Sequence, residues 1–300
     1  MTLHASSAPV SPALRLWRHF ASDKIALAGV LVLGALILLA LCAPWLVPQN
    51  PYDLSQLDIL DARLPPGSRS ADDKLLFWLG TDDQGRDMYS AIVHGMRISL
   101  GVGVAATLGA LVLGLALGLT AAYLGGKTDA AIMRLVDIQL SFPAILIALI
   151  LLAFFGQGLG KIIVALIAVQ WAYYARTVRS AALVEMGKEY IEAARCLHLS
   201  HRHIILHHLL PNCLPPLIVV AAMQVAAAIA LEATLSFLGL GLPITEPSLG
   251  LLISNGYAYL MSGKYWISFF PGMALLVMIV SINLVADRLR DVLNPKLQKQ

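Results

Sequence analysis

Long apolar stretches without a charged residue recur along this chain, and they limit what it can fold into. A helix that crosses a bilayer needs roughly 20 apolar residues. Runs of about that length, and two shorter ones that extend the pattern, lie at 25–47, 98–126, 138–160 and 265–286, then at 162–175 and 214–231. Hydrophobic residues make up 58% of the chain and charged residues only 13%, which is outside the usual range of soluble domains. The sequence therefore predicts an integral membrane protein.

Each apolar run is expected to be a helix, because backbone groups in lipid must find their hydrogen bonds within the segment. The run at 162–175 continues helically past Arg176 and Arg179, and the run at 214–231 ends at Glu232. The predicted fold class is an all-α membrane protein with six transmembrane helices. The first run is too long for a cleavable signal peptide, so it is interpreted as a retained anchor.

Lysine and arginine are distributed unevenly between the two sides that this topology creates. With a cytosolic N-terminus, most of them fall in cytosolic segments, and the positive-inside rule then favours both termini inside. The predicted parts are a cytosolic tail (1–24), a first transmembrane helix (25–47), an external loop (48–96), a transmembrane domain of five helices (97–287) and a second cytosolic tail (288–300). The net charge of +3 mostly reflects the basic residues that set this topology and says little about nucleic acid. Membrane lipid is therefore the expected surrounding, and no nucleic-acid partner is expected.

A charged, histidine-rich segment from Glu189 to Pro211 interrupts the apolar runs on the predicted cytosolic side. A helix is expected to begin at Glu192, and the segment closes where the next span starts. The prolines at 211, 215 and 216 predict that no continuous helix passes through that junction. We therefore expect a short helix across the membrane surface, which can transmit motion if a soluble protein holds it.

Signatures of catalysis are missing from the sequence. Residues 125–128 imitate the end of a phosphate-binding loop, but the required earlier glycine is Ala121 and a membrane span precedes the motif. The polar segment contains five histidines: His198, His201, His203, His207 and His208. They either form a divalent-cation site with Glu185, Glu189 and Glu192, or are polar residues of an aqueous loop. The three scattered cysteines predict neither a disulfide framework nor a metal cluster. No catalytic residue, metal ligand or cofactor is predicted for this chain.

Ionisable residues near membrane depth are candidates for function. Arg134 and Asp137 are three residues apart and are expected to pair with each other. Glu232 is isolated among apolar residues, so it either lines a pathway or bonds to a neighbouring helix. Gly114, Gly118 and Ala122 recur every four residues and predict close helix packing, with a gating role as the alternative.

The polar segment resembles the EAA loop of ABC importer permeases, in which a short coupling helix docks into a groove of the ATPase subunit. Further segments are similar to the dipeptide/oligopeptide/nickel branch of these permeases, in matching order from Leu16 to Lys296: LGTDDQGRD at 79–87, LSFLGLG at 235–241, PGMA at 271–274 and NLVADRLRDVLNPK at 283–296. The resemblance implies a type I ABC importer permease fold with a coupling loop at 185–211. It also implies a set of coupling residues: Glu189, Glu192, Ala193, Ala194, Leu197, His198, Leu210 and Pro211. A charge at Ala194 is then expected to abolish uptake without preventing membrane insertion.

The motif ahead of the second span is expected to form a tight hydrogen-bonded turn at the outer face, from Gly80, Thr81, Asp82, Asp83, Gly85, Arg86 and Asp87. This turn either caps the span or contacts a docking binding protein directly. The chain departs from the branch at three positions. His198 stands where a glycine usually forms the turn of the coupling loop, so that turn is expected to be strained. Leu249 and Ala286 replace the usual tryptophan and glycine.

The resemblance implies a non-catalytic permease subunit of a binding-protein-dependent importer of di- or oligopeptides in the bacterial inner membrane. The implied partners are a homologous second permease, two cytosolic ATPases that use ATP and magnesium, and an extracytoplasmic binding protein. Nickel, glutathione or another small solute is the alternative cargo. A stand-alone carrier or channel, and a membrane metalloenzyme that uses the histidines, are the rivals from other classes.

Overall fold

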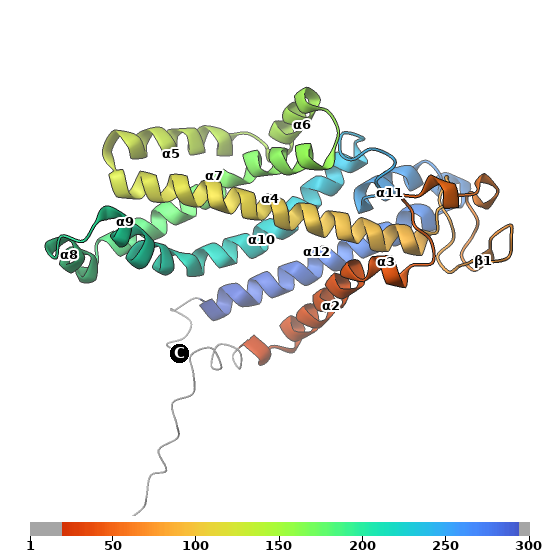
Figure 1. Ribbon diagram of the computed structural model, residues 1–300, viewed down its shortest axis with the longest axis horizontal. Helices are drawn as coiled ribbons and strands as arrows, with labels where there is room; N and C mark the ends of the chain where they lie inside the picture. The colour runs from red at the N-terminus through yellow and green to blue at the C-terminus, as the bar shows by residue number, and fades with distance from the viewer. Residues whose placement is uncertain (1–19, 294–300) are drawn as a thin grey trace, which may run out of the picture.

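The computed structural model describes residues 20–293, and these form a helical bundle with a small external hairpin (Figure 1). The main helices are α2 (Lys24–Leu41), α3 (Ala43–Leu46), α4 (Met88–Leu124), α5 (Gly126–Ser141), α6 (Ala144–Phe155), α7 (Leu159–Met186), α8 (Glu189–Cys196), α9 (His201–His203), α10 (Leu210–Phe237), α11 (Leu249–Tyr257) and α12 (Trp266–Leu293). Shorter elements are the 3-10 turns η1 (Leu54–Gln56), η2 (Ile59–Asp61) and η4 (Leu260–Ser262), the π-helix η3 (Ile204–Leu209), and strands β1 (Ser68–Arg69) and β2 (Leu76–Phe77). The two strands are antiparallel, with Ser68 opposite Phe77.

Within residues 20–293, four helices are long and apolar enough to cross a membrane: α2, α4, α12 and the helix that runs from His201 to Phe237. The pair α5 and α6 makes a fifth candidate if the two are one span. Helix α7, of 28 residues, is not in this group, and it carries Lys161, Arg176, Arg179 and Glu185. The expected class of membrane-spanning helical protein is confirmed, whereas the number of six spans stays a prediction.

The predicted continuous span at 138–160 is wrong, because the helix breaks after Ser141. Phe142 has extended backbone (φ −96°, ψ 144°), Pro143 precedes the next helix, and α5 and α6 are bent by 93°. Proline lacks the N–H that the helix needs, and it disfavours helical backbone in the residue before it. The Phe142-Pro143 pair therefore turns the chain where hydrophobicity alone predicts continuity.

The prolines at 211, 215 and 216 act differently from the prediction, since the helix from His201 to Phe237 passes through all three. Pro211 lies in the first turn of α10, where a missing N–H costs little. The wider π turn of η3 directly precedes it. Local π geometry is one way in which membrane helices accommodate proline. The predicted helix break at this junction is therefore wrong.

Helices α4 and α7 form the tightest part of the bundle. A side-chain carbon added to Gly114 would lie 2.5 Å from the carbonyl oxygen of Trp171, and one added to Gly118 would lie 2.6 Å from that of Ala175. Only glycine allows the two backbones to approach so closely. The packing interpretation of the small residues in α4 therefore agrees with the structure.

The bundle is elongated, and its two ends differ (Figure 1). Helix α8, the start of α2 and the end of α12 lie toward one end, whereas the β1–β2 hairpin and α11 lie toward the other. Arg288 in α12 donates to the Ser22 hydroxyl (3.0 Å), which joins the two chain ends. We call the first end the coupling end and the second the hairpin end. Most of the predicted tail at 1–24, and residues 294–300 of the other tail, lie outside the described residues.

Candidate functional site

Helix α8 follows α7 after a short turn at Gly187 and Lys188, and its charges suit its direction. Glu189 and Glu192 lie in its first turn and Arg195 in its last. Carboxylates near the N-terminus and a guanidinium near the C-terminus complement the helix dipole. A helix of only eight residues has little stability of its own, so its packing against the bundle has to hold it in place.

The two faces of α8 have different surroundings. Ile191 and Ala194 are buried, in one apolar cluster with Ile204 and Leu209 of η3. The opposite face exposes the predicted coupling residues Glu189, Glu192, Ala193, Leu197 and His198. Leu197 leaves 74% of its surface uncovered. The structure thus brings five of the eight predicted coupling residues to one exposed surface, which we call the coupling face.

The remaining three predicted coupling residues lie elsewhere. Ala194 is on the buried face of α8, so its side chain points into the bundle and not to the coupling face, and its role in coupling stays a prediction. The reason for its burial is the helical period, which places Ala194 with Ile191 three residues before it. Leu210 and Pro211 lie in the first turn of α10, where Leu210 packs against the same apolar cluster.

The turn after α8 has the strained geometry that the sequence predicts. His198 has φ +54°, in the left-handed region that favours glycine. The N–H of Leu199 donates to the carbonyl of Ala194 (3.2 Å), and that of His198 donates to the carbonyl of Arg195 (2.9 Å). These bonds cap the end of α8. A residue with a side chain costs about 1–2 kcal/mol in this conformation.

In the described residues, the other histidines contact each other and α4 and are not arranged as the ligands of a metal ion. The rings of His203 and His207 stack at 4.3 Å, and His201 Nδ1 is hydrogen-bonded to the hydroxyl of Tyr123 in α4. Within residues 20–293, no three His, Cys, Asp or Glu side chains converge as a metal site would require. The contact with Tyr123 ties the coupling loop to α4.

A tyrosine that sequence reasoning missed links α8 to both neighbouring helices, α7 and α10. The Tyr190 hydroxyl donates to Glu185 at the end of α7 (2.6 Å), and it accepts from the Asn212 amide at the start of α10 (3.2 Å). Lys188 also pairs with Glu185 (2.6 Å). The available signal was Asn212, a polar side chain between prolines at the entrance of an apolar run.

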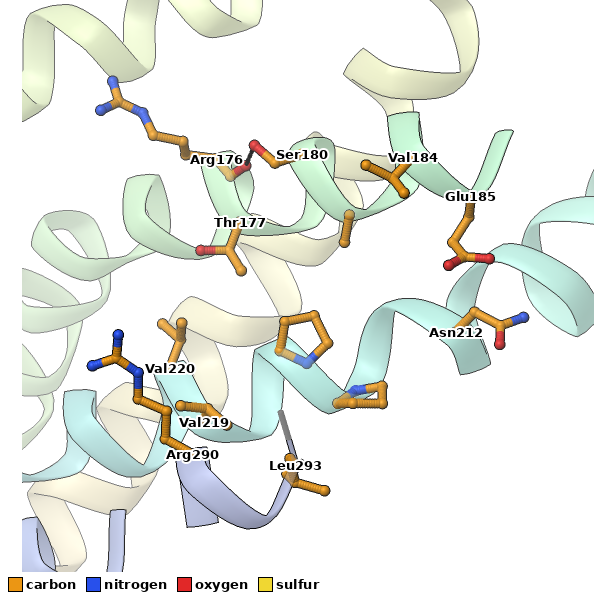
Figure 2. Close-up of a pocket in the computed structure, with 13 residues that line it drawn as sticks. Arg176, Thr177, Ser180, Val184, Glu185, Asn212, Val219, Val220, Arg290 and Leu293 are labelled. Carbon is orange, nitrogen blue, oxygen red and sulfur yellow. Dashed lines mark hydrogen bonds between the residues drawn. The ribbon is translucent and has the colours of Figure 1, made fainter. Parts of the chain in front are cut away.

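A cavity of about 930 Å³ opens between α7, α10 and the end of α12, next to this tyrosine (Figure 2). Its polar lining residues are Arg176, Thr177, Ser180, Glu185, Asn212 and Arg290, and the rest of its wall is apolar. Arg176 and Arg290 lie at one end of it, and Glu185 and Asn212 at the other (Figure 2). The two ends of the cavity are therefore polar and carry opposite charges, and the wall between them is apolar.

The predicted ion pair between Arg134 and Asp137 is wrong. Asp137 instead pairs with Arg176 of α7 (2.5 Å), and Asp129, two turns earlier in α5, pairs with Arg179 (2.5 Å). Both carboxylates lie on the face of α5 that meets α7. Tertiary packing of the two helices decides the pairing.

The turn at Gly80–Asp87 is a buried hydrogen-bonded junction at the hairpin end. The Arg86 guanidinium donates to the Asp82 carboxylate (2.6 Å), and both side chains are about 1% exposed. Arg86 also donates to the carbonyl of Ile244, before α11 (3.2 Å). The indole of Trp266, at the start of α12, donates to the carbonyl of Thr81 (3.2 Å). The turn therefore joins segments that are far apart in sequence.

The ends of this turn have specific roles. Asp87 caps α4, since its carboxylate accepts from the N–H and hydroxyl of Ser90 (2.9 and 2.6 Å). Gly80 and Gly85 have φ +78°, and a side chain on Gly85 would lie 2.2 Å from the Asp58 carbonyl. This geometry agrees with a structural cap for the span.

Asp83 is the acidic residue of the turn without such a role. It is half-buried, and one of its carboxylate oxygens is buried without a hydrogen-bond partner. Burial, followed by the neighbouring Asp82 carboxylate, raises the pKa of Asp83. If a binding protein touches this motif directly, Asp83 is the side chain available to it.

Glu232 is fully buried at the hairpin-end half of α10. Its carboxylate accepts hydrogen bonds from the Ser99 hydroxyl of α4 (2.9 Å) and from the Ser236 hydroxyl of its own helix (2.7 Å). The structure thus has the interhelical bond that was one of its two predicted roles. A role in a pathway stays a prediction.

Comparison with known proteins identifies the family. Residues 89–299 match the binding-protein-dependent transport system inner membrane component, and residues 11–66 match the N-terminal TM domain of oligopeptide transport permease C. The di/tripeptide transport system permease protein DppC of Pseudomonas aeruginosa is 35% identical, over 96% of this chain and 93% of that protein. The dipeptide transport system permease protein DppC of Escherichia coli K12 is 37% identical, over 97% and 95%.

The fold is similar to that of a solved transporter. An inward-facing structure of the MetNI methionine ABC transporter superposes with a TM-score of 0.56 at 22% identity, over 69% of this chain and 97% of that one. This likeness extends to the fold alone, and it agrees with the predicted type I importer architecture. The family model that matches residues 89–299 and the relatives at 35% and 37% identity show that the chain belongs to the binding-protein-dependent transport system inner membrane components.

Proposed function

We propose that this chain is a permease subunit of an ATP-driven, binding-protein-dependent importer of di- and oligopeptides. The family membership and the names of the relatives support a transport role and favour peptides as cargo. The single observation that carries the mechanism is the coupling face. It is an exposed surface on a short helix whose other face is anchored in the bundle.

The mechanism follows from how α8 is attached. Two cytosolic ATPases bind ATP and magnesium, and one of them holds the coupling face of this chain. The two ATPases close on each other and displace α8. Tyr190 bonds to both α7 and α10, so the displacement reaches both helices directly. This chain itself carries out no hydrolysis.

The assembly requires further subunits. A second, homologous permease completes the translocation path, and an external binding protein delivers the peptide at the hairpin end. We propose six spans, with α7 as a span because it packs along α4 and the α5–α6 pair as another. Both termini are then cytosolic, in the inner membrane of a bacterium. Nickel, glutathione or another small solute is the alternative cargo, and a stand-alone carrier is the more remote alternative.

Uptake of a labelled dipeptide by cells with and without this chain tests the proposal. Loss of uptake on deletion, restored by the intact gene, is the expected result. A strain without other peptide importers is needed, because a second system would mask the loss. Unchanged uptake in that strain would exclude dipeptides and move the proposal to the other solutes. Uptake by this chain without any ATPase would favour the stand-alone carrier.

A further inference from the structure

The cavity between α7, α10 and α12 has the charge layout of a site for a molecule with opposite charges at its two ends. Its volume of about 930 Å³ is within the range of small-molecule sites. Arg176 and Glu185 are nine positions apart in α7, which at 1.5 Å per residue separates their backbones by about 13 Å. An extended peptide of two or three residues spans roughly 7–11 Å. The distance between the two charged ends is therefore about the length of a short peptide together with the hydrogen bonds that its two termini would make.

The arginine end suits a carboxylate. Within the described residues the Arg290 guanidinium forms no ion pair, whereas Arg176 is paired with Asp137 (2.5 Å). A guanidinium binds a carboxylate through two parallel hydrogen bonds. Arg290 is consequently the group with free capacity, and Arg176 shapes the same end of the cavity.

The opposite end suits an ammonium group. Glu185 carries a negative charge, and its protein cation is Lys188, which is half exposed (side-chain exposure 50%). The lysine of this pair is half exposed whereas the Glu185 side chain is 13% exposed, so solvent weakens the hold of Lys188 and a substrate ammonium can compete with it for the carboxylate. Between the two ends, Val219, Val220 and two prolines line an apolar wall that tolerates varied side chains.

We propose that this cavity binds the imported peptide as a zwitterion, with its C-terminal carboxylate on Arg290 and its N-terminal ammonium on Glu185. The inference rests on the proposed peptide transport and adds a site on the permease to it. Tyr190 bonds to Glu185, so the coupling helix forms part of the ammonium end. Displacement of α8 therefore changes the ammonium end of the site.

Photolabelling of the complete purified transporter in lipid nanodiscs tests the site. The probe is a dipeptide with a benzophenone side chain, used without the binding protein, and the labelled residues are mapped by mass spectrometry. We expect labels within 176–185 and 212–220. Arg290→Gln should weaken labelling about tenfold, as should amidation of the peptide's C-terminus. Acetylation of its N-terminus and Glu185→Gln should act in the same way.

Lys127→Gln is the matched control, because Lys127 is an exposed cation near the coupling end that does not line the cavity. Labels elsewhere, or labels indifferent to Arg290→Gln, would overturn the site. If an anionic lipid blocks labelling whereas amidation of the peptide does not weaken it, the cavity binds lipid and the proposed peptide site is overturned too. In each case unimpaired dipeptide uptake by the same transporter, reconstituted into proteoliposomes with its binding protein, would leave the transport function standing. Absence of uptake by the complete transporter would instead contradict the function itself.

Discussion

At the residue scale, neighbours in sequence have opposite surroundings, and Ala193 and Ala194 are the clearest case. Ala193 lies on the coupling face, whereas Ala194 is 4% exposed and packs toward η3. The EAA resemblance marks both residues equally, but the helical period separates their roles. A charge introduced at each therefore tests a different property.

Ala193→Asp is expected to insert and fold normally and to lose most uptake, because it alters only the exposed face. Ala194→Asp is expected to destabilise the loop on the order of 3 kcal/mol, since it buries an unpaired charge. Uptake together with thermal unfolding of the purified chain separates the two outcomes. Normal uptake by a well-expressed Ala193→Asp variant would remove α8 from the docking surface.

Asp83→Asn is expected to stabilise the chain at neutral pH. Burial and Asp82 raise the pKa of Asp83 in the folded state. Its contribution to stability is thus complete below the unfolded pKa of about 3.9 and is lost as pH rises through the folded pKa. The variant should raise the unfolding temperature by about 1–3 °C at pH 7 and have no such effect below about pH 4.

The exposed Asp73→Asn is the control, and it should leave the unfolding temperature unchanged, because its pair with Arg69 is a surface pair. Uptake by Asp83→Asn then distinguishes the two interpretations of the external motif. A more stable chain with lower uptake would indicate contact with the binding protein. Unchanged uptake would leave the motif as a structural cap.

At the element scale, α8 is linked to its two flanking helices through one hydroxyl. Tyr190 contacts Glu185 of α7 and Asn212 of α10, and the rest of α8 is held by apolar packing. Packing resists displacement in any direction, whereas the hydrogen bonds specify which helices move together. Loss of the hydroxyl is therefore expected to affect transmission more than folding.

Tyr190→Phe should insert normally and transport fewer peptides for each ATP hydrolysed, by about two- to tenfold. A hydrogen bond to a charged group contributes about 1.5–3 kcal/mol, and water that bonds to Glu185 in the variant restores part of this energy, which leaves an effect of about two- to tenfold. ATPase activity and uptake are measured together in proteoliposomes. Tyr257→Phe, on the exposed end of α11, is the control. An unchanged ratio of uptake to hydrolysis in Tyr190→Phe would contradict this role.

At the scale of the whole molecule, the coupling end and the hairpin end should lie on opposite sides of the membrane. Cys196 on α8 and Ile59 in η2 are both exposed, one at each end. A membrane-impermeant maleimide added to spheroplasts that express this chain alone is expected to label Ile59→Cys and to spare Cys196. Cys196 should react once the membrane is permeabilised. The reverse pattern would invert the proposed topology.

Much of the organisation follows from local patterns in the sequence. Apolar run length predicts the four described helices that are long enough to cross a bilayer, because a bilayer imposes a minimum length on any helix. The strained turn at His198 was expected from the family resemblance and the compact turn around Arg86 from residue type and spacing, and both are present. The same local logic predicts a helix break at Pro211, where the structure has none.

The sequence by itself determined a helical membrane protein, the site of its coupling helix and its family motifs, because these depend on periodicity and length. Only the tertiary structure decided that Asp137 pairs with Arg176, that Ala194 is buried and that Arg290 shares a cavity with Glu185. Each of these depends on how helices distant in sequence pack face to face. That packing is set by the shapes of all the side chains in contact, which no local pattern contains.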